Sequence, residues 1–203
     1  MFNIPKEKLK ILKKLNDPKK IQAFLNSMPM NFEKDGDTCF SPMTVLDKNV
    51  CHCIEGAVLA ALALRLNGQP ALLLDLTANK NDYDHVVTVF KKYGKWGAIS
   101  KTNHAFLRYR EPVYSSIREL VMSYFHEYFD TTGRKSLRSF SAPVNLKKFD
   151  HLGWMTTKDD IDYIAEYLVK VKHFEILNRK QIMYLQKADP VESRAGKILE
   201  WEE

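Results

Sequence analysis

The chain has 203 residues, and its 31 lysines and arginines against 25 aspartates and glutamates give a formal net charge of +6. A hydrophobic content of 45% and a charged content of 28% are ordinary for a soluble globular protein. No apolar run approaches the roughly 20 residues of a membrane-spanning helix. The N-terminal residues do not have the pattern of a secretory signal. We therefore expect a cytoplasmic protein of one domain, 1–203, with no membrane partner.

Much of the positive charge falls near the N-terminus. The lysines of this segment are Lys6, Lys8, Lys10, Lys13, Lys14, Lys19 and Lys20. Such a run is usually the solvent-facing side of a helix, and contact with nucleic acid is the less common alternative. The aromatic residues that a single-strand binder places among its cations are absent there. A basic nucleic-acid-binding protein is therefore the third of three functional hypotheses.

The first third of the chain predicts helices and a loop. Residues 6–15 place leucines at helical spacing against lysines, which predicts an amphipathic helix. Asp17 followed by Pro18 is typical of an N-cap and first helical position, and Pro29 ends the second helix. Residues 30–38 are a loop by composition, and another short helical segment follows.

The central stretch predicts a buried helix followed by strands. Residues 53–66 are apolar almost all round, which indicates burial on more than one face, and Gly68 follows as a stop signal. Two or three short strands come next. We expect one over 71–76, one that His85 opens, and a returning strand after a turn near Tyr93 and Gly94.

The remainder of the chain predicts mostly helices. Residues 117–129 have helical periodicity, 131–141 are a break with basic residues, and 159–170 resemble a capped helix. A last amphipathic stretch covers 174–185. The polar tail, 189–203, is expected to be poorly ordered.

The three cysteines, Cys39, Cys51 and Cys53, are an odd number. Cys51 and Cys53 are too close in sequence for an ordinary disulfide, so we expect free thiols in a reducing compartment. The nucleophilic form of cysteine is the thiolate, which a helix N-terminus and a nearby imidazolium both favour. Cys53 sits where the first effect applies, and His85 would supply the second if its strand packs against the helix start. The alternative is that Cys53 is only a small buried hydrophobe.

An ordered set of features adds a resemblance. Its parts are Cys53-Ile54-Glu55-Gly56-Ala57 at the helix start, Leu64-Arg65-Leu66-Asn67-Gly68-Gln69-Pro70-Ala71 at its end, the strand His85-Val86-Val87-Thr88-Val89, and Trp96. Together these resemble the transglutaminase-like superfamily over residues 40–105. The resemblance implies a papain-like α+β core, in which a central buried helix packs on a small antiparallel sheet. It also implies that Cys53 and His85 form a dyad for acyl transfer on a peptide or protein amide. The N-terminal helices, 1–39, and a mostly helical C-terminal extension, 106–203, would be additions to this core.

One position departs from the superfamily pattern. Ser100 stands four residues after Trp96, where the superfamily has an aspartate. The third group orients the imidazole and stabilises its charged form, and a serine hydroxyl can orient but brings no charge. A two-residue turn at Tyr93-Gly94 would put Ser100 on the same face as His85, and Ser100 is therefore the first candidate.

Asn103 is the second candidate, because a one-residue bulge would reverse the faces and bring its amide toward the imidazole. Three further carboxylates remain open as alternatives, namely Asp75, Asp82 and Asp84.

Other constellations carry less weight. Cys51-His52-Cys53 suggests zinc, but neighbouring residues rarely ligate one ion and no second ligand pair completes the site. His52 is interpreted as a surface or capping residue. The acidic loop 79–84 lacks the glycine and distal glutamate of an EF-hand. Arg108-Tyr109-Arg110 is either a packing cluster or a site for a substrate carboxylate. No phosphate-binding loop is present, so no cofactor is predicted, and the incomplete ligand set means that no metal is predicted either.

The sequence therefore predicts an α+β domain with a transglutaminase-like core and three alternative functions. The first is thiol-dependent acyl transfer, by hydrolysis or cross-linking, with Cys53 as nucleophile, His85 as base and Ser100 or Asn103 as the orienting group. The second is a binding module that keeps the fold but has lost catalysis. The third is nucleic-acid binding, which would be steeply salt-dependent.

Overall fold

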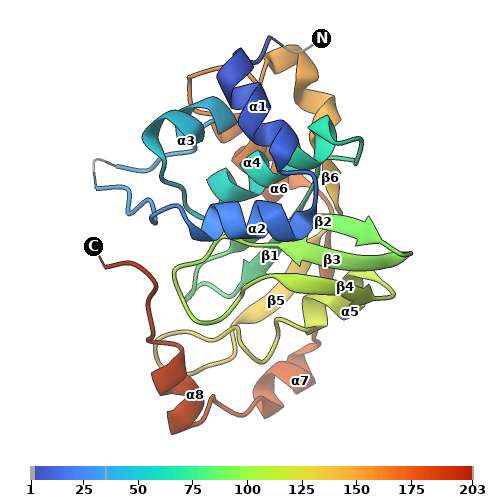
Figure 1. The fold of residues 1–203 in the computed structure, drawn as a ribbon. Coiled ribbons are helices and arrows are strands. Elements are labelled where there is room, and N and C mark those ends of the chain that lie inside the picture. The colour runs from blue at the N-terminus through green and yellow to red at the C-terminus, as the bar shows by residue number, and fades with distance from the viewer. Residues whose placement is uncertain (1–2, 35, 203) are drawn as a thin grey trace.

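The computed structural model describes residues 3–34 and 36–202 and has an α+β architecture (Figure 1). Within those residues, seven strands form one antiparallel sheet in the order β4-β3-β2-β1-β5-β7, with β6 paired to β1. The strands are β1 (Leu72–Ala78), β2 (His85–Lys92), β3 (Lys95–Ile99), β4 (Arg110–Tyr114), β5 (Leu137–Ser141), β6 (Val144–Asn145) and β7 (His173–Glu175).

Helices cover both faces of the sheet. They are α1 (Lys6–Lys14), α2 (Pro18–Asn26), α3 (Pro42–Lys48), α4 (Cys53–Leu66), α5 (Ile117–Met122), the 3₁₀ helix η1 (Leu146–Leu152), α6 (Asp162–Lys170), α7 (Arg179–Tyr184) and α8 (Pro190–Ala195). In Figure 1, α1 to α4 and α6 lie on one side of the sheet, and α5 and α7 lie on the other. Because strand side chains alternate, neighbours such as Leu73 and Leu74 enter two different hydrophobic cores.

The centre of the larger core is α4. Its sequence is apolar on every side, and all residues from Ile54 to Leu64 are buried. It contacts α1, α2 and α3 as well as strands β1 and β2. The predicted burial on more than one face is confirmed. Gly68, with a φ of 81°, adopts the left-handed conformation expected just after the helix.

The hairpin between β2 and β3 fixes the register next to the site. Lys92 pairs with Lys95, and the two residues between them, Tyr93 and Gly94, both have positive φ angles, of 53° and 75°. Such a turn matches the right-handed twist of the strands. The expected two-residue turn is therefore present. If the same register continues, the residue opposite His85 is 102, and residue 100, two positions earlier, is on the same face of the sheet.

The C-terminal part differs from the prediction. Residues 106–202 contain the helices α5, η1, α6, α7 and α8 and, in addition, the strands β4 to β7, which the prediction did not include. The expected helix over 117–129 ends at Met122, and the expected stretch over 174–185 divides into β7 and α7. These strands are short, and β5 and β6 form by pairing with β1, which lies far earlier in the sequence. Periodicity within a short window does not detect such long-range pairing.

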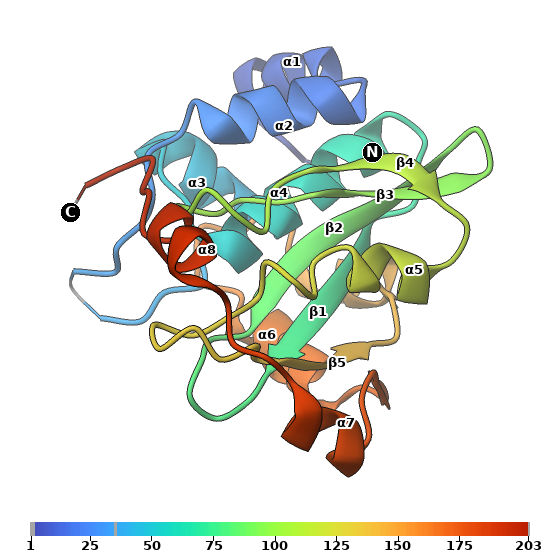
Figure 2. The same ribbon diagram turned by 90° about the horizontal axis from the view of Figure 1, so that it is seen from below.

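The tail also differs from the prediction. Instead of being disordered, it forms α8 and then pairs Leu199 with His104. Figure 2 shows this segment running from α7 through α8 back toward the helical layer. None of the helices in the described ranges 3–34 and 36–202 is long and apolar enough to cross a bilayer.

Candidate active site

Cys53 is the first residue of α4, and its side chain is partly exposed. The first amide of α4 that makes a helical hydrogen bond is that of Gly56, which donates to the His52 carbonyl. The amides of the preceding positions, Cys53 to Glu55, have no acceptor within the helix, because a helix leaves its first amides without one. Together with the helix dipole, they favour negative charge at the sulfur and on an oxygen bound next to it.

His85 opens β2 and lies between Cys53 and Ser100. Its ring lies close enough to the Cys53 thiol to lower the pKa of that thiol, by hydrogen bonding and by its charge, and its Nε2 lies 2.8 Å from Ser100 Oγ. The Ser100 hydroxyl donates its one proton to the Leu107 carbonyl, 2.5 Å away. Ser100 therefore accepts from His85, so Nε2 carries a proton. In the neutral ring, Nδ1 is then the nitrogen that is free to accept a proton from the thiol.

The backbone of Ser100 is itself held in place by α2. The Gln22 side chain accepts from the Ser100 amide at 2.9 Å and donates to the Ser100 carbonyl at 2.7 Å. Next along the chain, Lys101 approaches the first turn of α4 so closely that a Cβ on Gly56 would stand 2.7 Å from Lys101 Cβ. Glycine at position 56 therefore permits the approach of this segment to the Cys53 end of the helix.

For acyl transfer by Cys53, the chemistry that this arrangement allows, Ser100→Ala is expected to lower turnover about tenfold to a hundredfold, because His85 loses the acceptor that fixes its tautomer. Alkylation of the Cys53 thiol should change much less, because Ser100 has no charge. The measurement compares kcat with the alkylation rate in the same preparation. Ser27→Ala, which removes an exposed hydroxyl bonded to a carbonyl of its own helix, is the control. Equal losses in both quantities would mean that Ser100 only maintains the fold.

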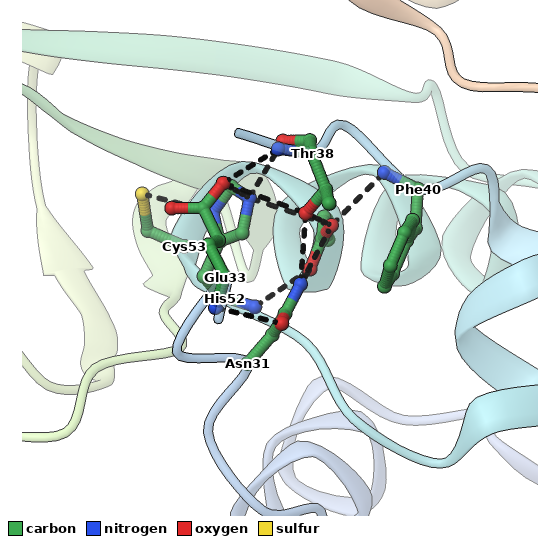
Figure 3. A network of polar contacts seen from close by, with 7 residues as sticks. Asn31, Glu33, Thr38, Phe40, His52 and Cys53 are labelled. Atoms are coloured by element: carbon green, nitrogen blue, oxygen red, sulfur yellow. Dashed lines mark hydrogen bonds and ion pairs between the residues drawn. The ribbon is translucent and has the colours of Figure 1, made fainter. Parts of the chain in front are cut away.

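A second imidazole contacts the same sulfur. His52 Nδ1 lies 3.9 Å from Cys53 Sγ (Figure 3). The other ring nitrogen, Nε2, lies 3.0 Å from the Thr38 carbonyl, 3.4 Å from a Glu55 oxygen and 3.5 Å from a Glu33 oxygen. A carbonyl only accepts, so His52 Nε2 is protonated. Sequence reasoning placed His52 as a surface or capping residue. It is indeed the N-cap of α4, but its ring also reaches the thiol.

Glu55, the acidic residue of the Cys53-Ile54-Glu55 motif, is fully buried. Its carboxylate accepts from the amide of Phe40, the amide of His52, the hydroxyl of Thr38 and the side-chain amide of Asn31. Figure 3 shows these donors converging from the loop before α3 and from the start of α4. Glu55 therefore caps α4 and fixes the loop on which Thr38 contacts His52.

The three thiols differ sharply in acidity. Burial opposes ionisation of Cys53, but hydrogen bonds from His52 and His85 and the charges of both rings outweigh it and lower the pKa of Cys53 from 9.0 to about 5. Burial raises the pKa of Cys39 and of Cys51 to about 12. Cys53 is therefore the cysteine whose surroundings favour a thiolate at neutral pH.

Asn103, the second candidate for orienting His85, is not in position to do so. Its amide donates to the Trp201 carbonyl at 2.9 Å and accepts from the Trp201 amide at 2.8 Å. The hairpin turn also has two residues and no bulge, so Asn103 lies on the opposite face of the strand from the residue that would face His85. That candidate was wrong, because the C-terminal tail occupies both ends of the Asn103 side chain.

The acidic alternatives have other partners. Asp75 contacts His173 at 3.2 Å, Asp84 accepts from the Ala78 amide at 2.8 Å, and Asp82 accepts from the Ser136 hydroxyl. Each carboxylate therefore has a partner other than the His85 ring.

The other residue groups that the sequence singled out have structural roles in this fold. Arg108 pairs with Glu200 and Arg110 pairs with Glu127, so both arginines of the 108–110 cluster have carboxylate partners within the chain. Cys51 is buried with its sulfur 3.9 Å from that of Met28, and it does not share a site with Cys53. In the described part of the chain, residues 3–34 and 36–202, no group of three or more acidic, histidine or cysteine side chains is arranged to hold a metal ion.

In comparisons with known proteins, no family model and no curated protein matches the chain. The functional interpretation therefore depends on the geometry of the site alone. Three of the four expected residues, Cys53, His85 and Ser100, are brought together. His52 and Gln22 join them. The sequence signal for His52 was its position directly before Cys53 and three residues before Glu55, which is the spacing of a capping box.

Proposed function

We propose that the chain is a thiol-dependent acyltransferase or amide hydrolase with a transglutaminase-like, papain-like core. The observation that carries this proposal is a partly exposed thiol at the N-terminus of a buried helix, between two imidazoles, with a pKa lowered to about 5. The second ring nitrogen of His85 is held by Ser100, as the third member of a catalytic triad would hold it. The cytoplasmic location, which would keep the thiol reduced, remains a prediction.

The reaction follows from the order Cys53, His85, Ser100. The Cys53 thiolate attacks the carbonyl carbon of an amide, and the amides of the first turn of α4 stabilise the oxygen that becomes negative. As the carbon–nitrogen bond breaks, His85 gives its Nδ1 proton to the departing amine. His85 then takes a proton from water or from an acceptor amine, which attacks the thioester and releases Cys53.

The class of substrate follows from the chemistry and remains a proposal. Within this proposal the substrate is a peptide or protein amide, because attack of the thiolate on a peptide bond or a side-chain amide gives a thioester and releases an amine. Water as acceptor gives hydrolysis, and a lysine-like amine gives cross-linking.

The test uses an activated ester first, because any acyl-accepting thiolate reacts with it. p-Nitrophenyl acetate should give a burst of one nitrophenolate per chain, and peptide mapping should place the acetyl group on Cys53. Cys53→Ala should abolish the burst, whereas the matched variant Cys51→Ala should keep it. Peptide amides, with water or hydroxylamine as acceptor, then identify the natural reaction. Absence of acetylation at Cys53 would contradict the proposal.

A binding module that has lost catalysis is the second candidate, and the neutral Ser100 favours it. An aspartate would stabilise the protonated His85 ring, and a serine does not. In that case acetyl-Cys53 should form but persist for hours, because His85 would not activate water. Turnover of the acetyl-enzyme within minutes would reject this candidate.

A further inference from the structure

Two imidazoles act on the Cys53 sulfur, whereas one is enough for a cysteine–histidine dyad. We propose that the two rings divide the work: His52 stays protonated and holds the Cys53 thiolate as a standing ion pair, while His85 alone carries the proton that moves. This inference rests on the proposed function for its catalytic meaning. The ion pair itself can be measured without any substrate.

The surroundings of His52 favour the charged form of its ring. Its Nε2–H donates to the Thr38 carbonyl at 3.0 Å, and two carboxylates, of Glu55 and Glu33, lie within 3.5 Å of the same nitrogen. Its Nδ1 faces the sulfur of Cys53 at 3.9 Å. Apart from the Glu55 backbone amide, which the capping box directs at the His52 side chain, these neighbours are acceptors or anions, and each favours the imidazolium.

His85 has different neighbours. Its Nε2 contacts the Ser100 hydroxyl, which is neutral and whose own proton is engaged by the Leu107 carbonyl. A ring without a carboxylate partner gains and loses a proton more readily than one next to two carboxylates. With a neutral serine at position 100, His85 is the ring that shuttles protons. The negative charge that an aspartate at position 100 would place next to His85 lies next to His52 instead, on Glu33 and Glu55.

The electrostatics of His52 agree with this division. Burial alone would lower the pKa of His52, but the hydrogen bond with Cys53 and the charges of Cys53 and Glu55 raise it to about 9. The other titratable groups on which the thiol acts are Tyr128, Cys39 and Cys51. None of these is a cation. Lys101, the nearby ammonium, acts on the buried Cys51.

The proton balance closes with His52 unchanged. In the resting state the Cys53 thiolate lies between two charged rings, and the mobile proton is on Nδ1 of His85. The sulfur–carbon bond forms, the carbon–nitrogen bond of the amide breaks, and the Nδ1 proton goes to the departing amine. Neutral His85 then removes a proton from water, whose oxygen attacks the thioester. The carbon–sulfur bond breaks, its electron pair returns to sulfur, and the His52 ion pair is restored.

The first arm of the test measures the rate of Cys53 alkylation by iodoacetamide from pH 4 to pH 9. His52→Gln is the test variant, because a glutamine amide still donates to the Thr38 carbonyl but cannot be charged. Its alkylation midpoint should rise by about one to two pH units. At pH 5.5 its rate should fall about tenfold, and by pH 8 it should equal that of the wild type. His151→Gln, an exposed histidine of η1, should leave the midpoint unchanged.

The second arm distinguishes the roles of the two rings by measuring how fast acetyl-Cys53 is hydrolysed in each variant. His52→Gln should regain wild-type turnover at pH 8, since its thiol is ionised there. His85→Gln should fail at every pH from 5 to 9, because it lacks the group that activates water. Recovery of both variants, or of neither, would overturn the division of roles.

The third arm needs no variant at position 52 and guards against misfolding of His52→Gln. The ¹⁵N spectrum of the imidazole rings should show one histidine in the wild type that stays protonated up to about pH 9. Its midpoint should fall by about one unit or more once Cys53 is alkylated, because the thiolate charge is gone. If every ring titrates between pH 6 and pH 7, His52 holds no ion pair. If the ion pair is present but no ester or amide is ever turned over, the proposed function fails and the ion pair does not.

Discussion

Replacing His85 by glutamine should lower acyl transfer by about a hundredfold to ten-thousandfold, because the reaction loses its general acid and base. The loss should appear in kcat for peptide amides, whose amine leaves only when it is protonated. Cys53 should still be alkylated at neutral pH, because His52 and the helix N-terminus remain. The measurement is steady-state turnover alongside the alkylation rate of the same sample.

The control for this variant is His151→Gln, which removes an exposed imidazole and should keep full turnover. If His85→Gln retained more than about a tenth of wild-type turnover, His85 would not be the proton carrier. His52 would then be the better candidate for general base.

The largest effect on stability is expected at Glu55. Glu55→Ala leaves the amides of Phe40 and His52 and the side chains of Asn31 and Thr38 without their shared acceptor. Buried donors without partners are costly, and the helix also loses its cap. We expect a loss of about 3–5 kcal/mol in the free energy of unfolding. That loss corresponds to a fall of about 10 °C in Tm for a chain of this size.

The matched control is Glu166→Ala on α6, which removes an exposed carboxylate that pairs with Lys170 one turn later. It should change the free energy of unfolding by about 0.5 kcal/mol or less. Glu55→Gln keeps one acceptor oxygen and should lie between the two. Denaturant unfolding of the three variants gives the comparison. A Glu55→Ala protein as stable as Glu166→Ala would show that the network around Glu55 contributes little.

The parts of the fold that could be predicted are those specified by nearby residues. The helix Cys53–Leu66 follows from a run that is apolar on every side and from Gly68 after it. The β2–β3 register follows from the two-residue turn at Tyr93 and Gly94, and that register brings Ser100 to His85.

The parts that could not be predicted depend on contacts between distant segments. Strand β5 forms by pairing with β1, some sixty residues earlier in the chain. Asn103 has the amide that a cysteine hydrolase uses, but Trp201, 98 residues later, occupies it. Glu33 reaches His52 only because the loop before α3 folds over the start of α4. No local pattern in the sequence indicates these contacts.

The most direct test of the central claim is the pH dependence of Cys53 alkylation in the unmodified protein. Iodoacetamide is applied from pH 4 to pH 10, and peptide mapping follows each of the three cysteines separately. Cys53 should react with a midpoint near pH 5, and Cys39 and Cys51 should stay unmodified while the fold is intact. A Cys53 midpoint near pH 9, the value of a thiol without imidazole partners, would contradict the account.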